Sequence, residues 1–212
     1  MSTNKIIKLL KETYKDPQCE LVYSSPFELL VAVVLSAQCT DKRVNMVTKE
    51  LFKSHNTAES FADMPLEELE MAIKSCGFYH NKAIAIKSLS SDIVNRFNGE
   101  FPKTKEDLKS LRGVGEKTAN VVVSLIFKEP AIAVDTHVFR VSNRLGLADS
   151  TTPEKTQKQL EVVLPKNYWS EAHYALVLHG RYVCKALRPN CETCPFTKVC
   201  KYYLGMKKNV SR

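Results

Sequence analysis

The sequence has little of what builds a β-sheet, a membrane span or a flexible linker. Glycine supplies only 7 of its 212 residues, and no stretch of strand length alternates cleanly between apolar and polar residues. No apolar run reaches the length of a membrane-spanning helix, and the amino terminus, MSTNKIIKLLKETYKDPQ, is too charged for a signal peptide. Internal repeats and low-complexity segments are lacking as well. We therefore expect a globular cytoplasmic protein without a membrane segment, in a compartment where thiols stay reduced.

Positive charge, in contrast, is in excess. Lys and Arg number 31 against 23 Asp and Glu, which gives a formal net charge of +8. This excess favours a polyanionic partner, with nucleic acid as the first candidate and an acidic membrane surface as the second. The alternative is that the charge only keeps the protein soluble. With 44% hydrophobic residues, the chain has ample material for a buried core.

Apolar residues recur at spacings of three and four along most of the chain, which is the pattern of amphipathic helices. The segments with this pattern are KIIKLLKETY, PFELLVAVVLSAQ, RVNMVTKELF, PLEELEMAIKSC and KAIAIKSLSSDIVNRF, followed by the stretch after Pro153 and residues 168–183. Prolines separate these segments, so that each helix runs about three turns. We expect an all-α protein of about ten helices. The best candidates for domain boundaries are DPQ, near Asp16, and EPAIAV, which begins at Glu129.

The stretch LRGVGEKTAN, residues 111–120, predicts a tight turn between two helices. Thr104 is expected to cap the first helix, with Asp107 in its first turn. Only RGVG separates this helix from the next, and glycines permit so tight a turn and let a phosphate approach the amides of the helix that follows. The pattern LxGxGxxTA resembles the helix-hairpin-helix motif of DNA repair proteins. The alternative is a plain turn between two helices.

The helix that starts at Glu116 has two distinct faces. Its apolar face carries Ala119, Val122, Val123, Ile126 and Phe127, and we expect it to pack against protein. Its polar side carries Lys117, Asn120, Ser124 and Lys128, and we expect it to face outward. Lys117 lies in the first turn, where the helix dipole disfavours a cation. Its amine is therefore a candidate nucleophile for Schiff-base chemistry, with a solvated lysine that touches phosphate as the alternative.

Asp135 ends the apolar run Ala131–Val134 and precedes a further helix, so we expect it to cap that helix. A carboxylate in such a place stays ionised and can stabilise positive charge on a sugar whose glycosidic bond is breaking. The alternative is a purely structural cap. On the same helix, Arg140 is a candidate phosphate contact, and His137 is as well explained by a structural role.

Four of the seven cysteines fall within 17 residues, in CKALRPNCETCPFTKVC, and indicate a metal site. One CxxC pair is flanked by single cysteines, a spacing that favours an iron–sulfur cluster over structural zinc, which usually takes two close pairs. Disulfides are the alternative, disfavoured in a reducing compartment. Lys185, Arg188, Lys198 and Lys201 place basic charge in the same loop. We interpret Cys19, Cys39 and Cys76 as ordinary buried thiols.

Taken together, LRGVGEKTANVVV, VDTHVFRVSNRLG, LHGRYVCKALRPNCETCPFTKVC and LSAQCTD resemble endonuclease III, the family of bifunctional DNA glycosylases and AP lyases of base excision repair. The likeness runs from about Ser25 to Tyr202. It implies a two-lobed helix-hairpin-helix DNA glycosylase fold. The first lobe is a six-helix barrel over residues 21–130 that includes the hairpin at 104–128. The second is a helical domain of residues 1–20 and 131–212, with a [4Fe-4S] cluster loop at 184–200.

The resemblance also implies roles for single residues. Lys117 matches the family's catalytic lysine, and Asp135 its catalytic aspartate. The implied cluster ligands are Cys184, Cys191, Cys194 and Cys200. The implied DNA contacts are Gln38, Phe78, Arg112, Gly113, Val114, Gly115, Arg140, Lys185 and Arg188. Asp41 also matches the family's pattern, either in the pocket or as the cap of the next helix.

Two positions depart from the family's pattern. Arg112 stands where the family usually has proline and adds positive charge to the hairpin. Phe78 stands where a leucine wedge is usual, and an aromatic ring there can stack on bases.

The function implied by the resemblance is excision of oxidised or ring-saturated pyrimidines from duplex DNA, followed by strand cleavage at the abasic site. We expect a monomer that binds damaged or abasic double-stranded DNA and is associated with the nucleoid. One alternative is a mismatch-specific glycosylase, although such relatives generally lack lysine at position 117. The other is a non-catalytic helix-hairpin-helix module with a metal-braced tip.

Overall fold

The computed structural model describes residues 3–210, which form twelve α-helices and one short 3-10 helix, with no strand among them. The helices are α1 (Thr3–Thr13), α2 (Pro26–Ser36), α3 (Asp41–Ser54), α4 (Ala58–Asp63), α5 (Leu66–Ile73), α6 (Tyr79–Arg96), α7 (Lys105–Ser110), α8 (Glu116–Ile126), α9 (Thr136–Leu145), α10 (Pro153–Val163), η1 (Lys166–Tyr168), α11 (Trp169–Tyr182) and α12 (Lys201–Val210). The expected all-α fold is confirmed. None of the helices in the described part of the chain has the length and apolar character that crossing a membrane requires.

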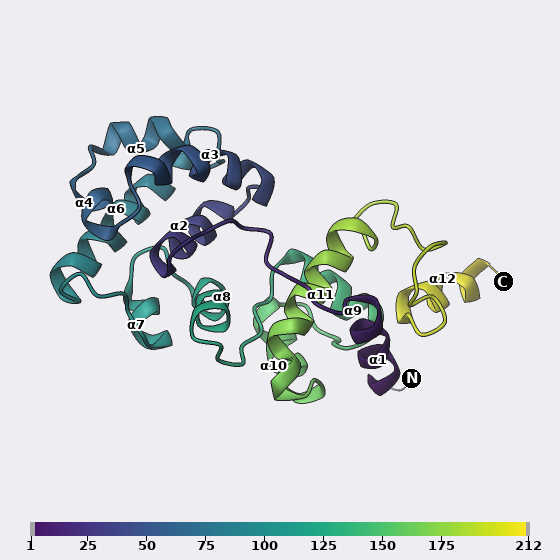
Figure 1. Cartoon of the computed structure of the whole chain (residues 1–212). Helices are drawn as coiled ribbons and strands as arrows, with labels where there is room; N and C mark the ends of the chain where they lie inside the picture. Colours follow the sequence, from purple (N-terminus) through teal and green to yellow (C-terminus); the bar gives the residue numbers. More distant parts are fainter. Residues whose placement is uncertain (1–2, 211–212) are drawn as a thin grey trace. The chain divides into compact units, whose positions relative to one another are not determined.

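The chain divides into two compact units. The central unit is Glu20–Glu129 and contains α2 to α8 (Figure 1). The terminal unit joins the segment that ends at Cys19 to the segment that starts at Pro130, and it contains α1 and α9 to α12.

The core of the central unit forms around α2, which is apolar on all sides. Nine of its residues, Phe27 to Leu35, are buried in an unbroken run, as expected of a helix enclosed by others. Pro26 occupies its first position, where proline needs no hydrogen-bond partner. The long helix α6 packs against α2, α4 and α5 (Figure 1).

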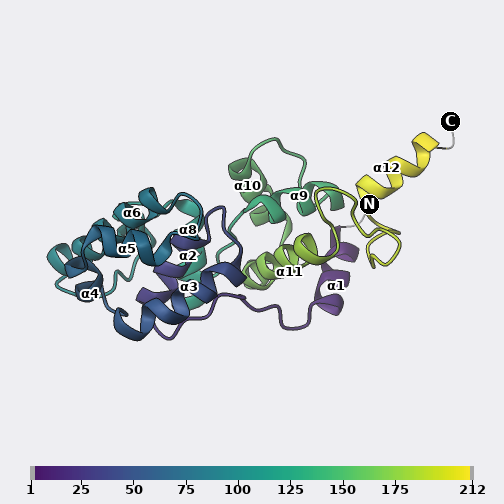
Figure 2. The ribbon, with the colours of Figure 1, turned by 90° about the horizontal axis from the view of Figure 1, so that it is seen from above.

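The terminal unit has a core of its own, to which distant parts of the chain contribute. Ile6, Ile7 and Leu10 of α1 join one cluster with residues of α9 and α11. Helix α9 lies beside α10 and α11 (Figure 2). The cysteine loop follows α11 and closes on the same core through Phe196 and Val199, both of which are buried.

The predicted helix-hairpin-helix is formed by α7 and α8. Thr104 caps α7 as expected: its hydroxyl accepts a bond from the Asp107 amide at 3.1 Å and donates to the Asp107 carboxylate at 2.7 Å. Helix α8 starts at Glu116, whose carboxylate forms ion pairs with Lys105 and, at 2.8 Å, with Lys109. These ion pairs connect α7 to the first residue of α8.

One expectation about α8 is wrong. Lys117 and Lys128 are exposed as predicted, but Asn120 and Ser124 on the same side are buried. The reason is that α8 packs against both α2 and α7. Because two faces of α8 are covered, exposed residues remain only in its first turn and beyond its last residue, from Lys128 onward.

The turn between α7 and α8 packs tightly against α6. Gly113 has a φ of +83°, and a Cβ added there would lie 2.8 Å from the Cβ of Ala85. Both the backbone angle and the contact therefore require glycine. Gly115 differs, since its φ is −89° and a Cβ would meet no atom within 4 Å.

We predict that Gly113→Ala lowers the free energy of unfolding by about 2 kcal/mol, because the methyl group is both strained and overpacked. Gly115→Ala is the matched control, and its cost should stay below about 1 kcal/mol. Urea unfolding of the two variants measures the difference. Equal losses would show that the turn does not depend on its contact with α6.

Candidate functional site

The hairpin presents one helix start to solvent. Arg112, Gly113 and Gly115 are exposed, whereas the Val114 side chain is buried and its amide donates to the Leu111 carbonyl oxygen at 3.2 Å. Gly115 is the N-cap residue of α8 and has no side chain to cover the amides that follow. The first turn of α8 is thus open to an anion.

Lys117 lies in this open first turn, and its side chain is exposed. Gly115, which precedes this turn, has no side chain that could cover the lysine. The carboxylate of the neighbouring Glu116 forms ion pairs with two lysines of α7. The central unit therefore places the exposed Lys117 amine beside a helix start that favours anions.

Asp135 caps α9 in the terminal unit, as predicted. Its Oδ1 accepts bonds from the amides of His137 at 2.9 Å and Val138 at 2.8 Å. Two amide donors fix the carboxylate at the positive end of the helix, which stabilises its ionised form. The carboxylate is half-buried.

The four loop cysteines are electrostatic neighbours. Burial raises the pKa of the Cys194 thiol, and negative charge on Cys200, Cys184 and Cys191 raises it further. Burial also raises the pKa of the Cys200 thiol, whereas backbone N–H groups of Tyr203 and Tyr202 lower it. Four thiolates so close together need a compensating cation. No group of three or more His, Cys, Asp or Glu side chains within the described residues surrounds a position for a single metal ion.

Arg144 supports the first part of this loop, and the sequence did not single it out. Its Nη1 donates to the Lys185 carbonyl oxygen at 2.7 Å and lies 3.5 Å from the Cys184 Sγ, and its Nη2 donates to the Ala186 carbonyl oxygen at 3.0 Å. These contacts cross about forty positions of sequence, so no local pattern could predict them. The only signal was its place on α9, one turn after Arg140.

Arg140 has the same kind of intramolecular role. Its guanidinium donates to the carbonyl oxygens of Cys184 at 3.0 Å and Gly180 at 2.8 Å. These bonds join α9 to the end of α11 and the start of the cysteine loop. A phosphate contact by Arg140 would have to compete with them.

His179 and Tyr14 also reach the cysteine loop, and neither was predicted. The Tyr14 hydroxyl lies 2.9 Å from His179 Nδ1, and His179 Nε2 lies 3.6 Å from the Cys194 Sγ. Burial lowers the pKa of His179 to about 4, so the ring is neutral. Burial raises the pKa of Tyr14 to about 12, so its hydroxyl can donate to Nδ1 while Nε2 donates toward sulfur.

Gln38 and Phe78 lie in two adjoining turns of the central unit. Both are exposed and both adopt left-handed backbone angles, with φ of 52° and 59°. The turns touch, because a Cβ on Gly77 would lie 3.5 Å from the Gln38 carbonyl oxygen. The alternative cap expected of Asp41 is wrong: the hydroxyl of Thr40 caps α3 by accepting a bond from the Arg43 amide at 3.3 Å.

Lys185 and Arg188 are exposed in the cysteine loop, and Arg188 has a φ of 48°. Their charges are therefore available to a partner.

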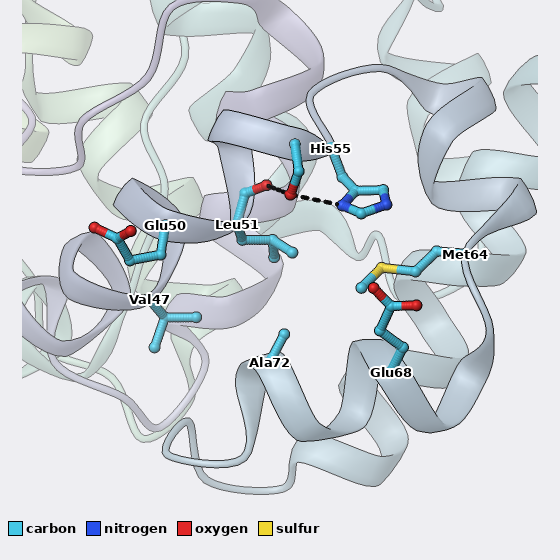
Figure 3. A pocket seen from close by; sticks show the side chains of 8 residues that line it. Val47, Glu50, Leu51, His55, Met64, Glu68 and Ala72 are labelled. Carbon is cyan, nitrogen blue, oxygen red and sulfur yellow. Dashed lines mark hydrogen bonds between the residues drawn. The ribbon is translucent and has the colours of Figure 1, made fainter.

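A separate pocket in the central unit has a volume of about 250 Å³. Val47 and Glu50 of α3 lie on one side of it, and Met64 and Glu68 lie on the other (Figure 3). None of the predicted site residues lines this pocket.

Comparison with known proteins identifies the family. The profile of the HhH-GPD superfamily of base excision DNA repair proteins matches residues 31–166. Endonuclease III of Bacillus subtilis (strain 168) is 50% identical over 193 residues, which cover 90% of this chain and 87% of the relative. The chain belongs to the endonuclease III family.

Further endonuclease III proteins agree with this assignment. That of Rickettsia conorii is 43% identical over 96% of this chain and 97% of its own. A solved structure of a trapped endonuclease III–DNA covalent intermediate superimposes with a TM-score of 0.93 at 45% identity, covering 98% of this chain and 99% of that one. The protein is therefore a base excision repair enzyme, a DNA glycosylase and AP lyase, and the alternatives of a mismatch-specific relative and a non-catalytic module are not favoured.

We predict that Asp135→Ala lowers the free energy of unfolding by about 1 kcal/mol through loss of the α9 cap, whereas Asp135→Asn stays within a few tenths of a kcal/mol because asparagine is an equally good cap. Urea unfolding monitored by circular dichroism provides the measurement. Thr152→Ala, which removes the α10 cap, gives the scale for a lost cap. An unchanged Asp135→Ala protein would contradict the capping role.

Proposed function

We propose that this endonuclease III family member excises oxidised or ring-saturated pyrimidines from duplex DNA through a Schiff base on Lys117 and then cleaves the strand on the 3′ side of the abasic site. The observation that carries the proposal is the exposed amine of Lys117 in the first turn of α8, beside the uncovered amides that follow Gly115. A backbone phosphate bound at that helix start brings the neighbouring sugar within reach of the amine.

The proposed reaction has two stages. The neutral amine of Lys117 attacks the sugar C1′, the bond from C1′ to the base breaks, and opening of the sugar ring leaves an iminium ion. The iminium then acidifies the C2′ proton, and its removal expels the 3′ phosphate by β-elimination. The carboxylate of Asp135 stabilises the positive charge on the sugar and assists the proton transfers.

Damage itself aids selection in this proposal. Rotating a base out of the duplex costs least when the ring is saturated or oxidised and stacks poorly. Gln38 and Phe78 are proposed to enter the gap that the extruded nucleotide leaves. The exposed Phe78 ring can stack on the neighbouring bases, as a leucine wedge cannot.

Binding of the DNA backbone is assigned to groups that the structure leaves exposed. We place one phosphate at the start of α8, with Arg112 beside it and the backbone of Gly113, Val114 and Gly115 around it. Lys185 and Arg188 of the cysteine loop add contacts from the second domain, which we delimit as residues 1–20 and 131–212 against a first domain of 21–130. The partner is damaged or abasic double-stranded DNA. We propose that the protein acts on it as a monomer associated with the nucleoid.

A [4Fe-4S] cluster fits the cysteine loop. Cys184, Cys191, Cys194 and Cys200 supply the four thiolates that such a cluster takes. Iron would neutralise the thiolate repulsion that, together with burial, raises the pKa of Cys191, Cys194 and Cys200. Backbone N–H groups of Phe196, Tyr202 and Tyr203 point at the sulfurs, as is common around clusters. The bound cluster supplies structural cross-linking, while Arg144 and His179 orient the ligand loop.

Borohydride trapping on abasic and thymine-glycol duplexes tests the role of Lys117. The wild-type protein should form a covalent adduct with both duplexes, and Lys117→Ala should lower adduct yield at least about 100-fold, because the variant lacks the proposed nucleophile while Lys105 and Lys109 are engaged by Glu116. Lys128→Asn is the matched control, since it removes a lysine near the other end of α8 and asparagine tolerates the φ of 57° there. A wild-type protein that gives no adduct would refute the lyase mechanism.

The same assay with Asp135→Asn separates capping from catalysis. Base release from the thymine-glycol duplex should fall at least about 100-fold, because the charge is lost while the cap is kept. Duplex affinity should remain close to that of the wild-type protein. Full base release by this variant would remove Asp135 from the mechanism.

Metal analysis tests the cluster. Protein purified without oxygen should be brown and contain about four iron atoms per chain. Cys191→Ser should lose most of the iron, whereas Cys19→Ser should retain it because Cys19 lies outside the loop. Protein that contains stoichiometric zinc and no iron would overturn the assignment.

A further inference from the structure

Two cysteines outside the metal loop lie in the adjoining turns that carry Gln38 and Phe78. Cys39 directly follows Gln38, and Cys76 precedes Phe78 by two residues. Cys76 is fully buried, whereas Cys39 is half-buried and so within reach of small molecules from solvent. The two thiols are electrostatic neighbours, because the charge of Cys39 acts on Cys76.

The backbones of the two turns touch at the same place. The Cys39 amide donates to the Ser36 carbonyl oxygen at 3.1 Å, and the Cys76 amide donates to the Ile73 carbonyl oxygen at 2.8 Å, so each cysteine ends a tight turn after a helix. A Cβ on Gly77 would lie 3.5 Å from the Gln38 carbonyl oxygen. The two turns therefore adjoin, and each carries a cysteine next to the point of contact, an arrangement from which a disulfide can form.

Positive charge surrounds the two sulfurs. Lys82 is 6% exposed, and its Nζ donates to the Leu35 carbonyl oxygen at 2.8 Å. Its charge and that of Arg43 act on Cys76 and favour a thiolate, although burial raises the pKa of Cys76 to about 11. Because Cys39 is the more accessible of the two, we expect an oxidant to react with it first. The buried Cys76 would then react with the oxidised sulfur of Cys39.

We propose that Cys39 and Cys76 form a reversible disulfide when the protein meets a hydroperoxide, and that this bond impairs the two turns assigned to DNA entry. With hydrogen peroxide as the oxidant, the thiolate of Cys39 attacks one peroxide oxygen and the O–O bond breaks. The other oxygen leaves as hydroxide and becomes water by taking up the proton that the Cys39 thiol released. The Cys76 sulfur then attacks the sulfenic sulfur of Cys39 and expels a second water that carries the Cys76 proton. One peroxide is reduced and two thiols are oxidised.

The bond changes the turns because the two sulfurs, which are not bonded in this structure, must approach to about 2.05 Å. The adjoining backbones already touch, so the turns can follow only by changing backbone angles next to Gln38 and Phe78. A displacement of about 1 Å at an active site can lower the rate about 100-fold. The effect on activity rests on the proposed function of these two residues, whereas formation of the disulfide does not.

The chemical part is tested on the intact, cluster-containing protein. After treatment with hydrogen peroxide or diamide and alkylation of free thiols, non-reducing tryptic digestion should yield peptide 16–42 linked to peptide 75–82. Peptide 16–42 also contains Cys19, so fragment ions must place the bond at Cys39. Cys19→Ala should leave the link in place, and Cys39→Ala and Cys76→Ala should each abolish it.

The functional part compares wild type and Cys76→Ala before and after the same oxidation. Thymine-glycol excision by the wild type should fall at least about tenfold and return with dithiothreitol, while Cys76→Ala should keep its activity. Both proteins carry the same four loop cysteines, so damage to the cluster lowers both alike and is followed by its absorbance. If Cys76→Ala is unstable, Cys39→Ala serves in its place.

Each outcome decides a separate claim. Absence of the linked peptide from oxidised wild type overturns the proposal, as does a linked protein that retains full activity. A reduced wild type that is inactive on every damaged duplex refutes the proposed function instead, and the peptide measurement still decides whether the disulfide forms.

Discussion

The contact between the RGVG turn and α6 determines where α8 begins. Gly113 lets the chain reverse direction against Ala85 with no space for a side chain, and the Glu116 carboxylate then ties the start of α8 to the two lysines of α7. Surface ion pairs contribute little by themselves. The dense packing of the turn against α6 therefore does most to fix the start of α8, and with it the position of Lys117. The two glycines have separate tasks, since Gly113 serves the fold and Gly115 leaves the helix start open.

Both proposed catalytic residues lie at helix starts, but the two helix starts are used in different ways. At α9 the dipole and two amides stabilise the charge of Asp135. At α8 no side chain caps the amides that follow Gly115, so that an external anion can bind beside Lys117. The same kind of helix start thus holds a side-chain anion in one unit and stays open to a bound anion in the other.

Local signals allowed much of this protein to be predicted from sequence. The caps at Thr104 and Asp135, the helix-hairpin-helix turn and the clustered cysteines are all encoded within a few residues of one another, and the all-α fold follows from the spacing of apolar residues. Burial of Asn120 and Ser124 could not be predicted, because it depends on α2 and α7 covering two faces of α8. The contacts of Arg144, His179 and Tyr14 with the cysteine loop were missed for the same reason. These contacts join residues far apart in sequence, so no periodic pattern of residue types in the sequence indicates them.

The first helix has a consequence for the order in which the protein is made. Helix α1 belongs to a core whose other members begin at Ile132, and Tyr14 bonds to His179 across 165 positions. During synthesis, all of the central unit emerges before α1 has any partner to pack against. The central unit can therefore fold while α1 waits as an exposed amphipathic segment, and the terminal unit closes last, after a long loop has been brought together at an entropic cost. Chaperone contact during synthesis should therefore fall on α1, although it leaves the ribosome before the whole central unit.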